Sequence, residues 1–209
     1  MPRGRALGYD TQRAEILARA AALFAQQGYT ATTMNQVAVA CGVSKPALYH
    51  YVRDKYQLLF EIAQDHIAHL SALVERVQAE PLTPEARLRR LIECFIEAYA
   101  DAQAAHRVLT EDVKFLDAAD REQVLGGERA VVRAFANAIV ALRPELAADK
   151  LQTPLTMLLF GMMNWMFTWL QPGGTLSHAD MAPIVADLFF GGIGAVRPAI
   201  PSQRPRRVK

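Results

Sequence analysis

The sequence predicts an all-α protein, and three observations support this prediction. Nearly every segment between glycines and prolines repeats its apolar residues every three or four positions, as one face of an amphipathic helix does. No segment shows the sustained alternation of apolar and polar residues that is typical of a half-buried strand. Helix-capping patterns stand at expected helix starts, as where Thr33 precedes Gln36 by three residues. A hydrophobic content of 52% excludes a disordered chain.

The boundaries of the expected helices have local reasons. The first helix begins near Thr11 and ends at Gly28, since glycine readily adopts the left-handed conformation at a helix end. Ser44 can cap a short helix that has Pro46 in its first turn, where a missing N–H costs nothing. Asp54 can cap a long helix. The helices expected besides the first and the short one cover 34–40, 55–78, 84–104, 106–116, 119–143, 147–170 and 178–196.

Two short helices on either side of Gly42 predict a helix-turn-helix motif. Gly42 supplies the positive φ of a tight turn. The small core shared by the two helices is expected to contain Val37, Ala38, Val43 and Leu48. In such motifs the second helix enters the major groove of DNA and its first residues reach base edges. These residues are Ser44, Lys45, Pro46 and Ala47, of which Lys45 can donate to guanine and the next two can contact a thymine methyl.

The residues that follow the second short helix are suited to contact phosphates. The hydroxyls of Tyr49 and Tyr51 and the ring of His50 can fix the helix on the DNA without reading its sequence. Thr33 and Lys55 stand at helix starts, where free N–H groups favour anions. The sequence leaves open which of His50 and Tyr51 turns inward.

The charge distribution agrees with binding of a polyanion by the N-terminal part. Residues 1–55 carry seven Lys or Arg against three acidic residues, and the tail from Arg197 carries five against none. The intervening body is acidic, with 11 basic and 18 acidic residues, although the whole chain has a formal charge of only +2. We therefore expect only the basic N-terminal segment to face DNA.

The stretch "ILARAAALFAQQGYTATTMNQVAVACGVSKPALYHYVRDKYQLLFEI" resembles the TetR family of one-component repressors, with a motif that covers roughly residues 11–63. The resemblance rests on Phe24, Gly28-Tyr29, Thr33, Ala40 to Ser44, Leu48 to Tyr51 and Lys55. It implies about nine helices, with a three-helix DNA-binding domain at 1–54, a ligand-binding and dimerisation domain at 55–197 and a tail at 198–209 that we expect to be disordered. It also implies DNA-facing roles for Thr33, Lys45, Pro46, Ala47, Tyr49, His50 and Lys55. Pro46 stands where many members have glycine, which affects base contacts.

The C-terminal apolar helices predict a homodimer. The stretch "LTMLLFGMMNWMFTWL" is apolar around nearly its whole circumference, which is typical of a helix buried on all sides. Together with "MAPIVADLFFGGIGAV" it can be buried against symmetry mates, and in the family the last two helices form a four-helix dimer interface. The alternative is core packing within one chain.

A cavity for a small hydrophobic effector is expected around Trp165. Trp165 and Trp169 are spaced to share one helix face. Met162, Met166 and Phe167 surround them, and the opposing walls are expected to be Phe95, Tyr99 and Phe115, although each could be ordinary core. The segment "NWMFTWLQPGG" is similar to that of members that sense CoA thioesters or other lipid-like acids. Arg87, Arg89 and Arg90 either meet an anionic head group or form a solvated basic face.

The sequence favours no enzyme, cofactor or metal site. A di-iron bundle needs Glu-x-x-His pairs, and none of the five histidines follows a glutamate by three residues. His66 and His69 lack partners at metal-site spacing, and no catalytic residues are predicted. We expect a cytoplasmic protein, because no signal peptide is evident and no apolar run is long enough to span a bilayer.

The prediction is therefore a ligand-responsive repressor that binds a palindromic operator as a dimer. Three alternatives remain open. They are a drug-responsive repressor of an efflux or detoxification gene, a DNA-binding protein without an effector, and an all-α enzyme.

Overall fold

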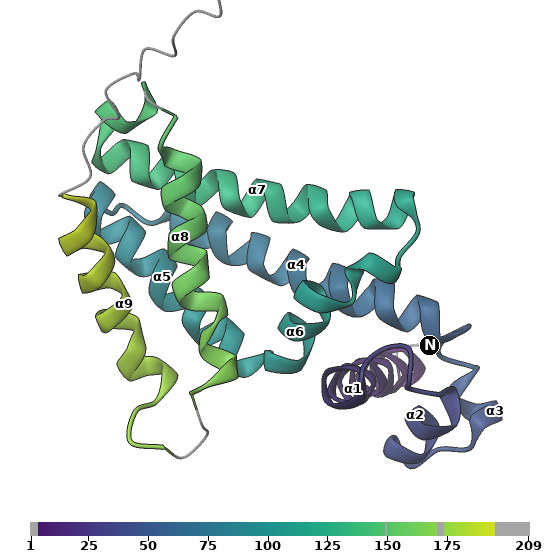
Figure 1. The fold of residues 1–209 in the computed structure, drawn as a ribbon. Helices are drawn as coiled ribbons and strands as arrows, with labels where there is room; N and C mark the ends of the chain where they lie inside the picture. Colours follow the sequence, from purple (N-terminus) through teal and green to yellow (C-terminus); the bar gives the residue numbers. More distant parts are fainter. Residues whose placement is uncertain (1–3, 149, 171–173, 195–209) are drawn as a thin grey trace, which may run out of the picture. The chain divides into compact units, whose positions relative to one another are not determined.

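The structure is a computed structural model that describes residues 4–148, 150–170 and 174–194. It confirms the all-α prediction, since every regular element within these ranges is a helix, and nine of them are α-helices (Figure 1). The elements are α1 (Gly4–Gln27), α2 (Met34–Ala40), α3 (Lys45–Leu48), α4 (Lys55–Ala79), α5 (Pro84–Asp101), α6 (Gln103–Glu111), the 3-10 helix η1 (Val113–Phe115), α7 (Ala118–Leu142), η2 (Pro144–Ala147), α8 (Gln152–Asn164), η3 (Met166–Thr168) and α9 (His178–Ile193). The predicted tail at 198–209 lies outside the described residues.

The predicted caps are confirmed at atomic detail. The Thr33 hydroxyl accepts from the backbone N–H of Gln36 (3.3 Å), and the Gln36 side chain accepts from the Thr33 N–H (2.8 Å), which completes a capping box. Asp54 accepts from the N–H of Gln57 at 2.7 Å. Gly28 and Gly42 have φ of +87° and +66°, which is the left-handed region.

One expected helix boundary is displaced, and one predicted helix is wrong in its continuity. The break expected between 104 and 106 lies at Ala102, whose φ and ψ of −120° and 38° separate α5 from α6. The helix expected over 147–170 ends at Asn164 and tightens into η3. There the Thr168 hydroxyl donates to the Trp165 carbonyl at 2.7 Å, so a side chain takes up a carbonyl that a continuing helix would need.

The chain divides into two compact units, which we describe separately. The first unit comprises residues 1–73 and 98–131, and the second comprises 74–97 and 132–209. These limits cut across α4, α5 and α7 instead of falling at residue 54. The functional domains predicted at 1–54 and 55–197 stay a prediction.

The first unit is organised around α1 and α4. Ile16 and Ala20 of α1 and Leu58 of α4 are completely buried in it. The Gly126-Gly127 pair does not interrupt α7, and Gly127 has a packing reason. A Cβ built on Gly127 would lie 2.8 Å from the Ile67 side chain, so the glycine permits α7 to approach α4.

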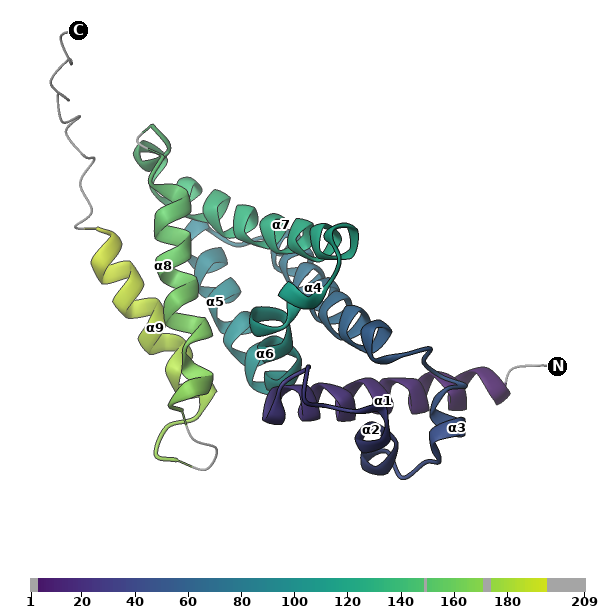
Figure 2. The ribbon, with the colours of Figure 1, turned by 45° about the vertical axis from the view of Figure 1, so that its right-hand side comes forward.

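The second unit has an aromatic core. The ring of Phe95 in α5 lies 4.8 Å from that of Phe135 in α7, and Phe160 of α8 lies 4.9 Å from Phe135. Figures 1 and 2 show α8 and α9 side by side at the edge of this unit, and the two helices are in contact.

Candidate nucleic-acid interface and effector region

The segment from α2 to α3 forms the predicted helix-turn-helix. Val37 of α2 and Leu48 of α3 are completely buried, and Ala38 is nearly so. The N–H of Val43 donates to the Ala38 carbonyl at 3.0 Å and closes the turn at Gly42. Val43 itself is only half-buried, so it borders the small core that Val37, Ala38 and Leu48 form.

The short helix α3 exposes the residues that we predict to read bases. The Ser44 hydroxyl caps it by accepting from the N–H of Ala47 at 3.2 Å, and Pro46 lies in its first turn. Lys45 and Pro46 are exposed, while Ala47 is half-buried. Tyr49 directly follows the helix with 45% of its surface exposed. The structure therefore leaves a cation and a tyrosine accessible at one short helix.

The structure decides which of His50 and Tyr51 turns inward. Tyr51 is half-buried, and its ring stacks on that of Tyr9 in α1 with centroids 4.9 Å apart. The Tyr9 hydroxyl donates to the backbone carbonyl of His50 at 3.3 Å. The side chain of His50 remains exposed. Tyr51 thus holds the end of the motif against α1, a role that the sequence did not indicate.

Lys55 is engaged inside the protein. Its ammonium group donates to the backbone carbonyls of Tyr29 (2.8 Å), Thr30 (3.3 Å) and Thr32 (2.9 Å), and it lies 4.4 Å from the Tyr29 ring centroid. The three donors of a lysine are therefore matched by three carbonyls. This geometry does not favour the phosphate contact expected for Lys55, because the side chain fastens the start of α4 to the loop after α1.

Two contacts tie the loop after α1 and the start of α4 to η1 and the start of α7. The ring of Phe115 in η1 stacks on Tyr29 with centroids 5.4 Å apart. The Tyr56 hydroxyl donates to Asp120 at 2.7 Å and accepts from the N–H of Asp117 at 3.1 Å. Phe115, expected as a wall of the effector cavity, instead covers the loop that Lys55 holds.

The other expected effector residues are also not gathered into one cavity. Tyr99 belongs to the first unit and stacks on His106 at 3.8 Å. Phe95 is part of the aromatic core of the second unit. Met166 is buried and Met162 half-buried, but Trp165 and Trp169 have exposed fractions of 66% and 50%. They do not share a helix face, because α8 ends before them. Phe167 has no described side chain.

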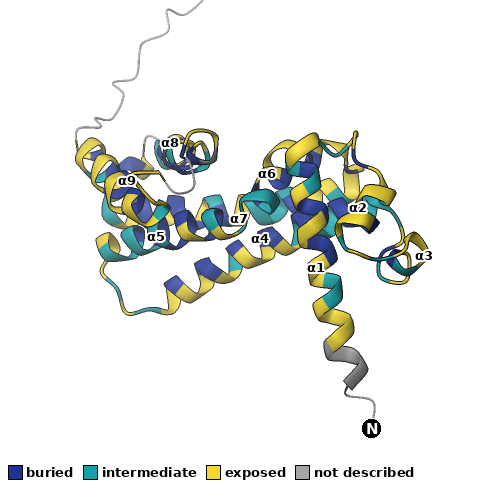
Figure 3. Cartoon of the chain, turned by 90° about the horizontal axis from the view of Figure 1, so that it is seen from below, coloured by how far each residue is buried: buried dark blue, intermediate teal, exposed yellow. Residues whose placement is uncertain are grey.

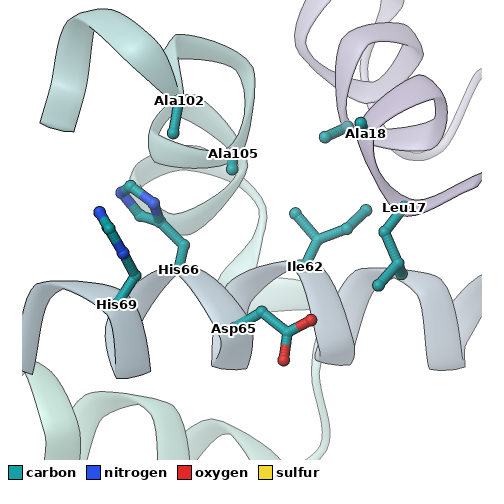
Figure 4. A pocket seen from close by; sticks show the side chains of 9 residues that line it. Leu17, Ala18, Ile62, Asp65, His66, His69, Ala102 and Ala105 are labelled. Carbon is teal, nitrogen blue, oxygen red and sulfur yellow. The ribbon is translucent and has the colours of Figure 1, made fainter. Parts of the chain in front are cut away.

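A hollow of about 310 Å³ lies in the first unit, between α1, α4 and α6. Its lining residues are Leu17, Ala18, Ala21, Ile62, Asp65, His66, His69, Ala102 and Ala105. Figure 4 shows that α4 contributes Ile62, Asp65, His66 and His69 to it. None of the seven residues expected to bind the effector lines this hollow. Sequence reasoning missed it because four of its nine lining residues are alanines, which give no local signal of a binding site.

Beside this hollow, two buried histidines join α4 to α6. The Nε2 atom of His66 lies 3.2 Å from the Nδ1 atom of His106, so one ring donates and the other accepts. Burial lowers the pKa of His66 to about 4 and that of His106 to about 3. The charge of His69 lowers the pKa of His66 further, and that of His66 lowers the pKa of His106 further. Both rings are therefore neutral at pH 7. The buried Nε2 of His106 has no partner among the described residues.

This pair predicts a loss of stability in mild acid. Because the pKa of each folded histidine is lower than its ordinary value of about 6.5, the unfolded chain takes up the proton first as the pH falls. The free energy of unfolding should be highest above pH 6.5 and fall by up to about 1.4 kcal/mol per pH unit for each histidine below it. Urea denaturation at pH 7, 6 and 5 measures the slope.

The exposed His50 provides the control for this measurement. The variant His50→Gln should keep the slope of stability against pH. The double variant His66→Gln/His106→Gln should flatten it. An unchanged slope in a folded double variant contradicts the assignment.

The second unit has an apolar face that the described residues leave uncovered. Met157 and Leu158 of α8 and Leu188 of α9 have exposed fractions of 53%, 66% and 65%. A Cβ built on Gly161 or Gly191 would meet nothing within 4 Å. Figure 3 shows that α9 has one buried and one exposed side. Within the single chain the α8 segment is therefore not buried on all sides, and its complete burial, expected through symmetry mates, stays a prediction.

The described residues hold no group of three His, Cys, Asp or Glu side chains that could bind a metal ion. Among the helices of the same residues, none is long and apolar enough to cross a membrane.

Comparison with known families accounts for most of the chain. Residues 16–62 match the family described as "Bacterial regulatory proteins, tetR family". Residues 81–193 match "Tetracyclin repressor-like, C-terminal domain", which is more than half of the sequence. The chain belongs to the TetR family. This confirms the resemblance carried by the helix-turn-helix and extends it through the helical body.

Solved TetR-family structures share the fold along the chain. A TetR-family transcriptional regulator from Bordetella parapertussis 12822 is 32% identical, with a TM-score of 0.83 over 90% of this chain and 98% of that one. AibR, crystallised in complex with isovaleryl coenzyme A and operator DNA, has a TM-score of 0.72 at 24% identity and covers 85% of this chain and 97% of its own. At this identity the likeness to AibR shows the fold alone.

Among curated TetR-family relatives, the transcriptional repressor KstR2 of Rhodococcus jostii is 32% identical over 114 residues. The match covers 54% of this chain and 56% of KstR2. The chain thus spans about half the length of the first curated relatives it matches.

Proposed function

We propose that this TetR-family protein is a transcriptional repressor that binds a palindromic operator as a dimer and releases it on binding a small hydrophobic effector. The observation that carries the proposal is the helix-turn-helix, whose buried core fixes α2 against α3 while Lys45, Pro46 and Tyr49 remain exposed. A helix held in this way can enter a major groove with its first residues against base edges.

The exposed residues divide into base and phosphate contacts. Lys45 and Pro46 stand at the start of α3, where we propose that they read bases, together with Ser44 and Ala47. Tyr49, His50 and the Thr33 end of α2 are exposed and would contact phosphates. For Lys55 and Tyr51, the internal contacts described above support a positioning role instead.

The uncovered face of α8 and α9 supports the dimer. Exposed apolar residues on two adjacent helices are stabilised when a second copy covers them, and the open glycines allow close approach. Two copies would place two recognition helices on successive major grooves, about 34–36 Å apart.

KstR2 is named as a transcriptional repressor, which supports a repressor role for this protein. The complex of AibR with isovaleryl coenzyme A supports a CoA thioester as the effector. A hydrophobic drug is the second candidate class. In either case the coupling is reciprocal, because an effector that weakens operator binding must itself bind less tightly to the operator complex. The hollow between α1, α4 and α6 and the histidine pair beside it lie where an effector could act on α4, which begins directly after the helix-turn-helix.

Operator binding by two variants tests the DNA interface. With an operator selected from random DNA, Lys45→Ala should weaken binding by about tenfold to a hundredfold, as the loss of a base contact does. Tyr49→Phe should weaken it by a few-fold, because a single hydrogen bond is lost. Fluorescence anisotropy measures both affinities, and Lys45→Ala should also lower the slope of affinity against salt.

Arg133→Ala is the matched control, since it removes a positive charge from an exposed site on α7. Its operator affinity should equal that of the wild type. If Lys45→Ala and Tyr49→Phe also bind like the wild type, the assignment of α3 fails. The addition of isovaleryl-CoA, with free CoA as reference, tests the release of the operator in the same assay.

A further inference from the structure

The three neighbouring arginines at the start of α5 differ in their partners. Arg89 donates to Asp187 at 2.8 Å and to Glu85 at 3.3 Å. Arg90 pairs with Glu93 at 3.4 Å and Glu80 at 4.0 Å. Arg87 instead donates to the backbone carbonyl of Glu80 at 3.1 Å and has no carboxylate partner in the part of the chain that the structure describes.

Arg87 lines a hollow of about 230 Å³ in the second unit. The hollow lies between the end of α4, the start of α5 and the end of α7, and its lining residues are Gln78, Pro84, Arg87, Leu91, Ala134, Asn137, Ala138 and Ala141. Its walls are thus apolar apart from two amides and one guanidinium group. No acidic residue is among these lining residues, so the charge at the hollow is that of Arg87.

The guanidinium group of Arg87 is not fully satisfied by the protein. Its Nε atom is buried and has no hydrogen-bond partner among the described residues. A buried donor without an acceptor is destabilising, and for a charged group the loss is larger than for a neutral one. The half-buried side chain therefore brings a fixed positive charge to the hollow, while its Nε donor has no exposed surface and is out of reach of a ligand there.

We propose that this hollow binds a small carboxylate with a compact apolar body. The planar fork of an arginine matches the two oxygens of a carboxylate, and the amides of Asn137 and Gln78 can donate to the same group. Leu91 and the alanines of α7 would cover the apolar body. An amine would meet an uncompensated cation, and a neutral amide would lose the charge-assisted hydrogen bonds.

The test of this site uses no operator DNA, so this proposal and the proposed function fail or succeed separately. Benzoate is a suitable probe, because it combines a carboxylate with a compact ring. In the purified full-length chain, benzoate should raise the melting temperature in a concentration-dependent way, since a ligand that binds the folded state stabilises it by mass action. Benzamide and benzylamine, which keep the ring but change the head group, should leave the melting temperature unchanged.

Variants on α5 and α7 locate the binding. Arg87→Met should weaken benzoate binding, measured by titration calorimetry, by at least about tenfold, because charge-assisted hydrogen bonds are lost. Asn137→Leu, at an exposed position on α7, should weaken it by a few-fold. Arg90→Gln is the matched control, because it removes a neighbouring arginine that already has carboxylate partners, and it should bind benzoate like the wild type.

If Arg87→Met does not fold, Arg87→Lys keeps the charge but not the fork and should still weaken binding. The proposal is overturned if wild-type protein shows no shift with benzoate. It is equally overturned if benzamide shifts the melting temperature as much as benzoate, or if the folded Arg87 variant binds benzoate as the wild type does.

Discussion

The variant Leu188→Glu is expected to be a monomer that no longer binds an operator. Leu188 lies on α9 with 65% of its surface exposed, and it belongs to the apolar face that we propose as the dimer interface. Burying a leucine contributes about 1.5–3 kcal/mol, and two-fold symmetry repeats each loss on both sides of the interface. A buried, unpaired glutamate adds a further desolvation penalty. A monomer would contact one half-site only, which removes most of the operator affinity.

Sedimentation or light scattering measures the mass, and circular dichroism shows whether the helices remain. Ala130→Glu, at an exposed position on α7, is the matched control and should keep the mass and the operator affinity of the wild type. The proposed interface is wrong if Leu188→Glu retains twice the mass of one chain.

The variant Phe95→Ala is expected to lose about 3–5 kcal/mol of stability, the usual range for truncating a buried phenylalanine. Phe95 has no exposed surface, and its ring lies against Phe135 at 4.8 Å and Phe160 at 6.2 Å. Removing the ring would leave a cavity between α5, α7 and α8, which carry Phe95, Phe135 and Phe160. Denaturation in urea measures the loss.

This experiment also separates two roles for Phe95. As a core residue, it should tolerate Phe95→Leu at a cost below about 1.5 kcal/mol, because leucine keeps much of the volume. A residue that mainly lined an effector cavity would give alanine and leucine variants of nearly wild-type stability. That second outcome would restore the interpretation that the sequence alone suggested.

The elements that sequence reasoning placed correctly depend on short-range interactions. The capping box of Thr33 and Gln36, the Ser44 cap and the left-handed Gly42 all involve residues within a few positions of each other. The helix-turn-helix consists of such neighbours, so the sequence could predict both its turn and its core. The break between α5 and α6, expected at 104–106, lies at Ala102, where no side-chain cap marks the helix start.

Where the partners of a side chain are distant in sequence, the structure does not favour the role that the sequence predicted for that side chain. Lys55 has the residue type and helix position of a phosphate ligand, yet carbonyls about 25 residues earlier take up its donors. Trp165 and Trp169 have the spacing of one helix face, but α8 ends before it can form that face. Arg87 differs from Arg89 and Arg90 only through which carboxylates lie nearby in space.

The sequence by itself determined the all-α class, most helix boundaries, the helix-turn-helix and the family. Hydrophobic periodicity, helix caps and turn glycines are enough to predict these features, because each of these signals acts between residues that are close in the sequence. Only the tertiary structure decided that Tyr51 turns inward, that His66 meets His106 and that Phe95 is core. These outcomes depend on which helices approach each other, and the partner of a side chain across such a contact is not encoded in its own neighbourhood.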